Sequence, residues 1–138
     1  MRKLFLDDIR IPKDAITLVP SNLNKMYWEK DWDIVRNFDE FLQYLMSSGV
    51  PDLISFDHDL ADFHYDFKPE DYEAMGEDEL ITRFGSKEKT GLDCAKILVD
   101  YCIVAKKPLP EYIVHSANPT GKENIEKFLI NAKKHLGI

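Results

Sequence analysis

The sequence predicts an α/β domain in which helices surround a small parallel sheet. Three short runs indicate its strands: Leu4 to Leu6, Leu53 to Phe56 and Tyr112 to Val114. These runs are nearly continuous in apolar residues, whereas strands with one wet face alternate, so they fit strands that are covered on both faces. A weaker fourth candidate runs from Trp32 to Val35. Apolar residues at helical spacing between and after the runs complete an α/β alternation with right-handed crossovers.

Three helices are expected between and after the strands. The first begins at Asp39 as its N-cap and ends before Gly49. The second opens near Thr90 and Gly91. The third opens near Pro119, which suits a first helical turn because its missing N–H costs nothing there.

Two segments interrupt this alternation. Residues 10 to 31 look like a loop, with a turn or two of helix from Leu23 to Lys30. Residues 62 to 89 form a long insertion that holds nine acidic and four basic residues. An insertion of this length is either a functional lid over the site or a solvated acidic excursion, and both interpretations stay open.

The composition limits the classes of protein to which this chain can belong. The 138 residues fit a single domain, 1–138, and the 44% hydrophobic content suffices for a core. The net charge of -7 argues against an extended nucleic-acid-binding surface. No apolar run exceeds five residues, so no membrane span is expected. Cys94 and Cys102 lie about 12 Å apart along one predicted helix, too far for a disulfide, and free thiols suit a cytoplasmic protein.

Ionisable and polar residues follow the ends of three predicted strands. They are Asp7 and Asp8 after the first, Asp57, His58 and Asp59 after the second, and His115 and Ser116 after the third. Because open parallel sheets bind ligands beyond the carboxyl ends of their strands, we expect a functional site at this edge.

The aspartates predict a metal site. Carboxylates crowded at one edge repel one another unless a cation intervenes, and Mg²⁺ or Mn²⁺ prefers such oxygen ligands. Asp8 and Asp57 are the best candidate ligands, together with Asp7. Asp7 or Asp59 would alternatively cap a following turn, and for Asp59 this is the preferred interpretation.

The histidines predict proton transfer. His58 and His115 follow strands that we expect to be neighbours, and two imidazoles there would serve as general base and general acid. They would alternatively ligate a metal, and the sequence does not separate these roles. His64 and His135 lack a comparable setting and are expected at the surface.

The start of the last helix predicts phosphate contacts, because helix N-termini attract anions. Gly121 allows a phosphate to approach the backbone closely, and Lys122 adds positive charge. The guanidinium of Arg10, in the loop after the first strand, would make paired hydrogen bonds to a phosphate. The alternative for Thr120 and Lys122 is helix capping and a solvated charge. The full predicted set is Arg10, Ser116, Asn118, Thr120, Gly121 and Lys122.

Four blocks, in this order, resemble the cyclic-phosphate processing receiver-like family: Leu6 to Pro12, Ser55 to Leu60, Thr90 to Ala95, and Val114 to Pro119. The resemblance spans nearly the whole chain. It implies a receiver-like, flavodoxin-like sheet of about four parallel strands with helices on both faces. It also implies that Asp7 and Asp8 help to hold a divalent ion and that Asp57 occupies the phosphoacceptor position.

The sequence departs from ordinary receivers in two ways. His115 and Ser116 stand where a receiver carries a lone Ser or Thr, and no fifth strand with the usual Lys is evident, so the fold is expected to be truncated at its C-terminus. The extra histidines favour hydrolytic or cyclising chemistry, and the resemblance implies cyclic phosphates on nucleotides or RNA ends as the substrates. The predicted function is the metal-assisted hydrolysis or formation of these cyclic phosphates, with Asp57, His58 and His115 as catalytic residues. The alternative is a non-catalytic signalling or nucleotide-binding module, phosphorylated at Asp57 if it signals.

Overall fold

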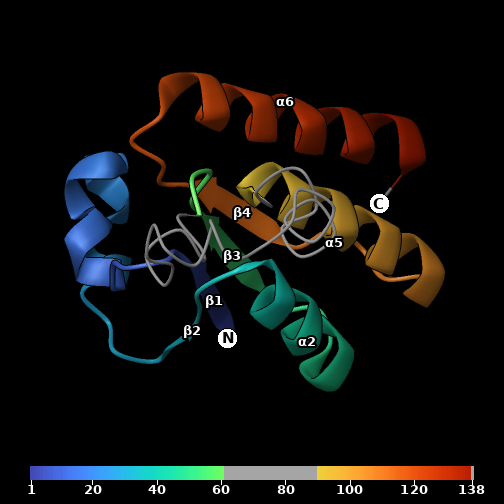
Figure 1. Ribbon diagram of the computed structural model, residues 1–138, viewed down its shortest axis with the longest axis horizontal. Helices are drawn as coiled ribbons and strands as arrows, with labels where there is room; N and C mark the ends of the chain where they lie inside the picture. The colour runs from blue at the N-terminus through green and yellow to red at the C-terminus, as the bar shows by residue number, and fades with distance from the viewer. Residues whose placement is uncertain (61–89, 138) are drawn as a thin grey trace, which may run out of the picture.

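A computed structural model describes residues 1–60 and 90–137 of the chain (Figure 1). Its strands are β1 (Lys3–Leu6), β2 (Trp32–Val35), β3 (Leu53–Phe56) and β4 (Glu111–Val114). They form one all-parallel sheet in the order β2-β1-β3-β4. The predicted strands and their parallel arrangement are confirmed, and the predicted acidic insertion at 62–89 lies outside the described residues.

The register of the sheet aligns the four strand ends. Leu6 at the end of β1 lies beside Val35 of β2 and Phe56 of β3, and Phe56 lies beside Val114 of β4. The residues that follow the strands therefore meet at one edge. The central strands β1 and β3 are wholly buried, which explains their nearly unbroken apolar sequences, while the edge strands β2 and β4 contain exposed residues.

Three long helices follow the later strands: α2 (Phe38–Ser48), α5 (Gly91–Ala105) and α6 (Pro119–Leu136). Thr90 caps α5 and Pro119 begins α6, as the sequence predicts. The predicted cap of α2 is wrong by two residues. Asn37 is extended and its side chain accepts a hydrogen bond from the Glu40 amide, so Asp39 lies inside the first turn.

The segment between β1 and β2 is more regular than the predicted loop. It contains the 3₁₀ helices η1 (Pro12–Leu18) and η2 (Ser21–Leu23) and the short helix α1 (Asn24–Tyr27). A 3₁₀ helix has three residues per turn and is short, so it leaves no 3.6-residue apolar period in the sequence. Only the turn near α1 is visible from the sequence.

Two apolar clusters show what covers each face of the sheet. Leu4 and Phe56 pack with residues of α2, α5 and α6, whereas Phe5 and Leu53 pack with Tyr27 and the other short-helix residues. In Figure 1 the sheet separates these short helices from α2 and α5. The connection from β1 to β2 crosses the sheet in the opposite direction to the later connections, and right-handed crossovers place such connections on opposite faces. Helices therefore cover both faces, as predicted.

Two predictions from composition concern the helices. Cys94 and Cys102 are both buried free thiols on α5. Among the residues that the structure describes, no helix combines the length and the apolar character that crossing a membrane requires.

Candidate functional site

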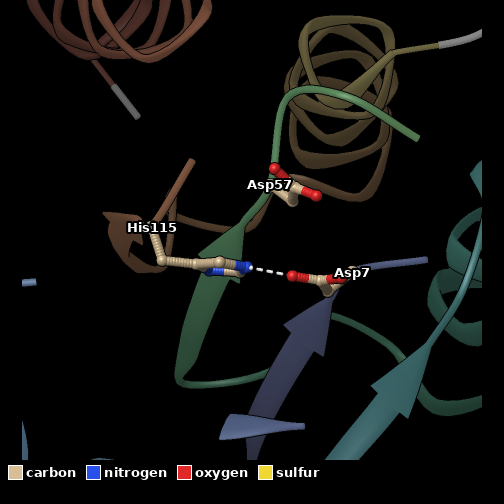
Figure 2. A group of neighbouring side chains, drawn as sticks. All are labelled: Asp7, Asp57 and His115. Carbon is tan, nitrogen blue, oxygen red and sulfur yellow. Dashed lines mark hydrogen bonds and ion pairs between the residues drawn. The ribbon is translucent and has the colours of Figure 1, made fainter. Parts of the chain in front are cut away.

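The candidate site lies where the chain connections diverge. From β1 the chain passes to β2 on one side, while β3 and β4 lie on the other side, and ligands bind at this kind of switch point in open α/β sheets. Asp7, Asp57 and His115 follow β1, β3 and β4, and their potential metal-ligand atoms all lie within 4.8 Å of one another (Figure 2). The convergence expected from the strand ends is present in the structure.

Backbone hydrogen bonds carry the sheet one residue beyond the strands. The amide of Asp7 donates to the carbonyl of Val35 at 3.1 Å, and the amide of Asp57 donates to the carbonyl of Leu6 at 2.9 Å. The amide of His115 donates to the carbonyl of Phe56 at 2.9 Å. The three site residues are therefore attached to the rigid sheet rather than to free loops.

Asp7 is a fully buried carboxylate with four donors. Its Oδ1 accepts from the amides of Ile9 and Arg10 at 3.0 and 2.8 Å. Its Oδ2 accepts from His115 Nε2 at 3.0 Å and from Arg10 Nη1 at 3.3 Å. Burial by itself raises the pKa of Asp7, but the bonds from His115, Arg10 and Ile9 outweigh it and hold that pKa well below its usual value. Asp7 is therefore ionised at neutral pH.

Asp57 is a second buried carboxylate in a different setting. Burial, followed by the negative charge of Asp7, raises the pKa of Asp57 to about 7, and Arg10 opposes this shift. The Arg10 Nη1 lies 3.9 Å from Asp57 Oδ2. Asp8 is half-buried, and its charge also raises the pKa of Asp57. Excess negative charge at this point is what a divalent cation would relieve.

The grouping differs in one member from the predicted metal set. The compact cluster consists of Asp7, Asp57 and His115, with Asp8 acting on it through its charge. The two carboxylates are suitable oxygen ligands for a divalent ion, so the donor chemistry fits Mg²⁺ or Mn²⁺, while both ring nitrogens of His115 are engaged by Asp7 and Ser55.

His115 is wholly buried and uses both ring nitrogens. Its Nδ1 lies 2.6 Å from Ser55 Oγ and its Nε2 lies 3.0 Å from Asp7 Oδ2. The ring stacks on Phe5 with 4.4 Å between ring centroids and 7° between planes. Burial lowers the pKa of His115, although the neighbouring Asp7 acts in the opposite direction. A neutral, immobilised imidazole results.

His58 lies in a separate setting between two helix starts. Its Nδ1 is 2.8 Å from Asp59 Oδ1, and the Gly91 amide of α5 donates to its carbonyl at 2.8 Å. At Gly121 of α6, an added Cβ would lie 2.3 Å from a carbon of the His58 ring. Asp59 also accepts from Asn118 Nδ2 at 3.3 Å, so its carboxylate contacts two side chains. His58 and His115 thus have different partners.

The predicted phosphate-binding residues divide into two groups. Arg10 lies with the carboxylates, and its side chain is 30% exposed. At the start of α6, Ser116 accepts from the Asn118 amide, and Asn118 caps the helix by accepting from the Gly121 amide at 3.0 Å. The close approach that Gly121 allows is made by His58. Thr120 is exposed and Lys122 is half-buried.

The sequence analysis does not identify three residues that the structure places at the site. Ser55 and Tyr27 extend the hydrogen bonding behind His115, with 2.6 Å between their oxygens. Arg36 donates from Nη1 to the carbonyls of Asp7 and Arg10 at 3.2 and 2.6 Å. Arg36 directly follows β2, so the same strand-end rule that finds Asp7 would have found it. Ser55 is signalled only by being polar inside a buried strand.

The fold and site together define a receiver-like domain, with parallel strands in the order β2-β1-β3-β4 and acidic residues after β1 and β3. Residues 2–131 match the cyclic-phosphate processing receiver domain family, and the chain belongs to that family. The resemblance carried by the four sequence blocks is thereby confirmed. Searches among curated proteins and solved structures gave no significant match.

Proposed function

We propose that this protein hydrolyses or forms cyclic phosphates on nucleotides or RNA ends with the help of a divalent cation. Membership of the cyclic-phosphate processing family supports the substrate class. The observation that carries the proposal is the pair Asp7 and Asp57, two buried carboxylates held side by side with a raised pKa on Asp57. Such a pair is unfavourable alone and favourable around a cation.

Asp7 and Asp57, with Asp8 nearby, would hold Mg²⁺ or Mn²⁺. When bound, the ion would supply positive charge to a phosphoryl oxygen as negative charge develops there. Arg10 lies next to both carboxylates and is partly exposed, so its guanidinium is suited to bind the same phosphate. Ser116, Asn118, Thr120, Gly121 and Lys122 remain candidate phosphate contacts at the start of α6.

His58 is the better supported proton-transfer group. Asp59 engages its Nδ1, which leaves Nε2 to take a proton from the attacking water and to return one to the leaving alkoxide. In hydrolysis a water oxygen bonds to phosphorus, one ring P–O bond breaks, and the freed oxygen takes up a proton. His115, the other predicted catalytic histidine, is buried with both nitrogens engaged, which favours a role in orienting Asp7.

The test uses nucleoside 2′,3′-cyclic phosphates and RNA with a cyclic phosphate end, each followed by ³¹P NMR with Mg²⁺ or Mn²⁺. The ring-opened monoesters are tested in the reverse direction. Conversion that is lost in Asp57→Asn and retained in the surface variant Asp100→Asn supports the proposal. No conversion of any of these substrates by the wild-type protein would refute it.

The second candidate is a receiver-like signalling module phosphorylated on Asp57. Its support is the place of Asp57 directly after β3 and beside Asp7, which is where a receiver carries its phosphoacceptor. Incubation with acetyl phosphate and Mg²⁺, followed by mass spectrometry, distinguishes the candidates. A phosphoaspartate at residue 57 with no turnover of cyclic phosphates favours signalling.

A further inference from the structure

A line of buried polar side chains reaches the site from the face covered by the short helices. Tyr27 Oη lies 2.6 Å from Ser55 Oγ, and Ser55 Oγ lies 2.6 Å from His115 Nδ1. His115 Nε2 then lies 3.0 Å from Asp7 Oδ2. All four residues are 0% exposed, so the line is shielded from bulk water throughout. It joins α1, β3 and the ends of β4 and β1.

The positions of these residues follow from the pleat of the sheet. Phe5 and Ser55 are register partners on β1 and β3, and Phe5 belongs to the cluster that also contains Tyr27. Side chains two residues apart in a strand lie on the same face. Asp7 stands two residues after Phe5, and His115 stands two residues after Ile113, which packs against the same cluster.

Donor and acceptor chemistry gives this line of hydrogen bonds one direction, in which each group donates to the next from Tyr27 to Asp7. The Asp7 carboxylate accepts from two backbone amides and from Arg10, so the Nε2 atom of His115 carries the hydrogen at Oδ2. The hydroxyl of Tyr27 donates to Ser55, so the Ser55 hydrogen goes to Nδ1, which carries the lone pair of the ring. Burial raises the pKa of Tyr27 to about 12, which keeps that hydroxyl protonated.

We propose that Tyr27 and Ser55 are positioning residues of the site, which hold His115 as a fixed Nε2–H donor and thereby set the orientation of the Asp7 carboxylate. Without the Ser55 hydroxyl, Nδ1 would be a buried acceptor with no partner, and the ring would lose one of its two anchors. The segment between β1 and β2 therefore contributes to the site as well as to the core. Only the consequences for metal binding and turnover rest on the proposed function.

Side chains that hydrogen-bond to metal ligands generally fix the orientation of those ligands. Their loss typically costs about 10- to 100-fold in metal affinity or activity. Tyr27→Phe removes one hydroxyl and keeps the ring, which packs 5.2 Å from Trp32 and 6.4 Å from Phe5 between centroids. Ser55→Ala removes the central hydroxyl. Tyr44→Phe is the matched control, because it also removes one tyrosine hydroxyl. That hydroxyl donates to Asp33 on the edge strand β2 and takes no part in the line to His115.

The primary readout is NMR of the protein without substrate or metal ion. Imidazole ¹⁵N shifts of His115, assigned by their absence in His115→Gln, report which nitrogen carries the hydrogen, and the carboxyl ¹³C shift of Asp7 reports its bonding. We expect an Nε2–H ring in the wild-type protein. We expect a large Nδ1 shift change in Ser55→Ala, a smaller one in Tyr27→Phe, altered Asp7 shifts in both, and no change in Tyr44→Phe.

A second readout is Mn²⁺ affinity by titration calorimetry, which should fall about 10-fold in Ser55→Ala. An Nδ1–H ring in the wild-type protein would overturn the proposal, because the line would then run in the opposite direction. Unchanged His115 and Asp7 shifts in a folded Tyr27→Phe protein would overturn it as well. If the shifts behave as expected while no cyclic phosphate is turned over, the positioning role stands and the proposed function fails.

Discussion

Replacing Asp57 by Asn tests the electrostatics of the site most directly. The pKa of this carboxyl rises from 3.8 to about 7 on folding, mainly because of burial and then because of Asp7. The folded protein therefore holds the Asp57 proton more tightly than the unfolded chain does. As pH rises from about 4 to about 7, the folded state loses that advantage and the free energy of unfolding decreases.

The size of the effect follows from the same two values. They differ by about three pH units, and each unit corresponds to about 1.4 kcal/mol, so the ionised Asp57 destabilises the metal-free protein by up to about 4 kcal/mol at pH 8. Asn has nearly the same shape and no charge. We expect Asp57→Asn to be more stable than the wild-type protein at pH 8, with a melting temperature raised by about 3 °C per kcal/mol. At pH 4 this advantage should largely vanish.

A divalent ion should offset most of this difference in stability. At 100 times its dissociation constant, a bound ion stabilises the folded protein by about 2.7 kcal/mol. The wild-type protein should gain this in Mg²⁺ or Mn²⁺, while Asp57→Asn should gain little. Thermal melts followed by circular dichroism, at pH 4 and pH 8 with EDTA or with the ion, measure both effects. Asp100→Asn, an exposed change on α5, is the control.

Two results would refute this reasoning. If the difference in melting temperature between Asp57→Asn and the wild-type protein is the same at pH 4 and pH 8, Asp57 is not an electrostatically unfavourable carboxylate. If the wild-type protein shows no response to either ion in melts and calorimetry, the metal is removed from the proposed mechanism.

Three further predictions concern neighbouring groups. His58→Ala should reduce cyclic-phosphate turnover by about 10²- to 10⁴-fold in steady-state assays without unfolding the protein. A near wild-type rate in both His58→Ala and His115→Ala would rule out proton transfer by either histidine. Gly121→Ala should lower the rate by displacing the His58 ring, which has a carbon 2.3 Å from the new Cβ, whereas Asn124→Ala, an exposed change on the same helix, should not. Arg36→Met removes two bonds to the carbonyls of Asp7 and Arg10, so calorimetry should show weaker Mn²⁺ binding; unchanged affinity would contradict that positioning role.

The sequence was sufficient to predict those features that depend on neighbouring residues or on a regular spacing of apolar residues. The runs at β1 and β3 predict buried strands because a central parallel strand has no wet face. The cap at Thr90 and the first-turn position of Pro119 follow from the N–H groups that have no partner within the helix at its start. The meeting of Asp7, Asp57 and His115 also followed from the sequence, since parallel strands must bring their carboxyl ends to one edge.

Tertiary structure decided which atoms within that edge face one another. Tyr27 and Ser55 are 28 residues apart, and Ser55 and His115 are 60 apart, so no sequence period connects them. The position of the His58 ring also depends on a distant residue, because the ring packs at Gly121 of α6. The roles of the two histidines separate for this reason: burial and hydrogen-bond partners are properties of packing. The sequence determined that charged groups would converge, and the packing of α1 and α6 against the sheet determined which of them are fixed and which are accessible.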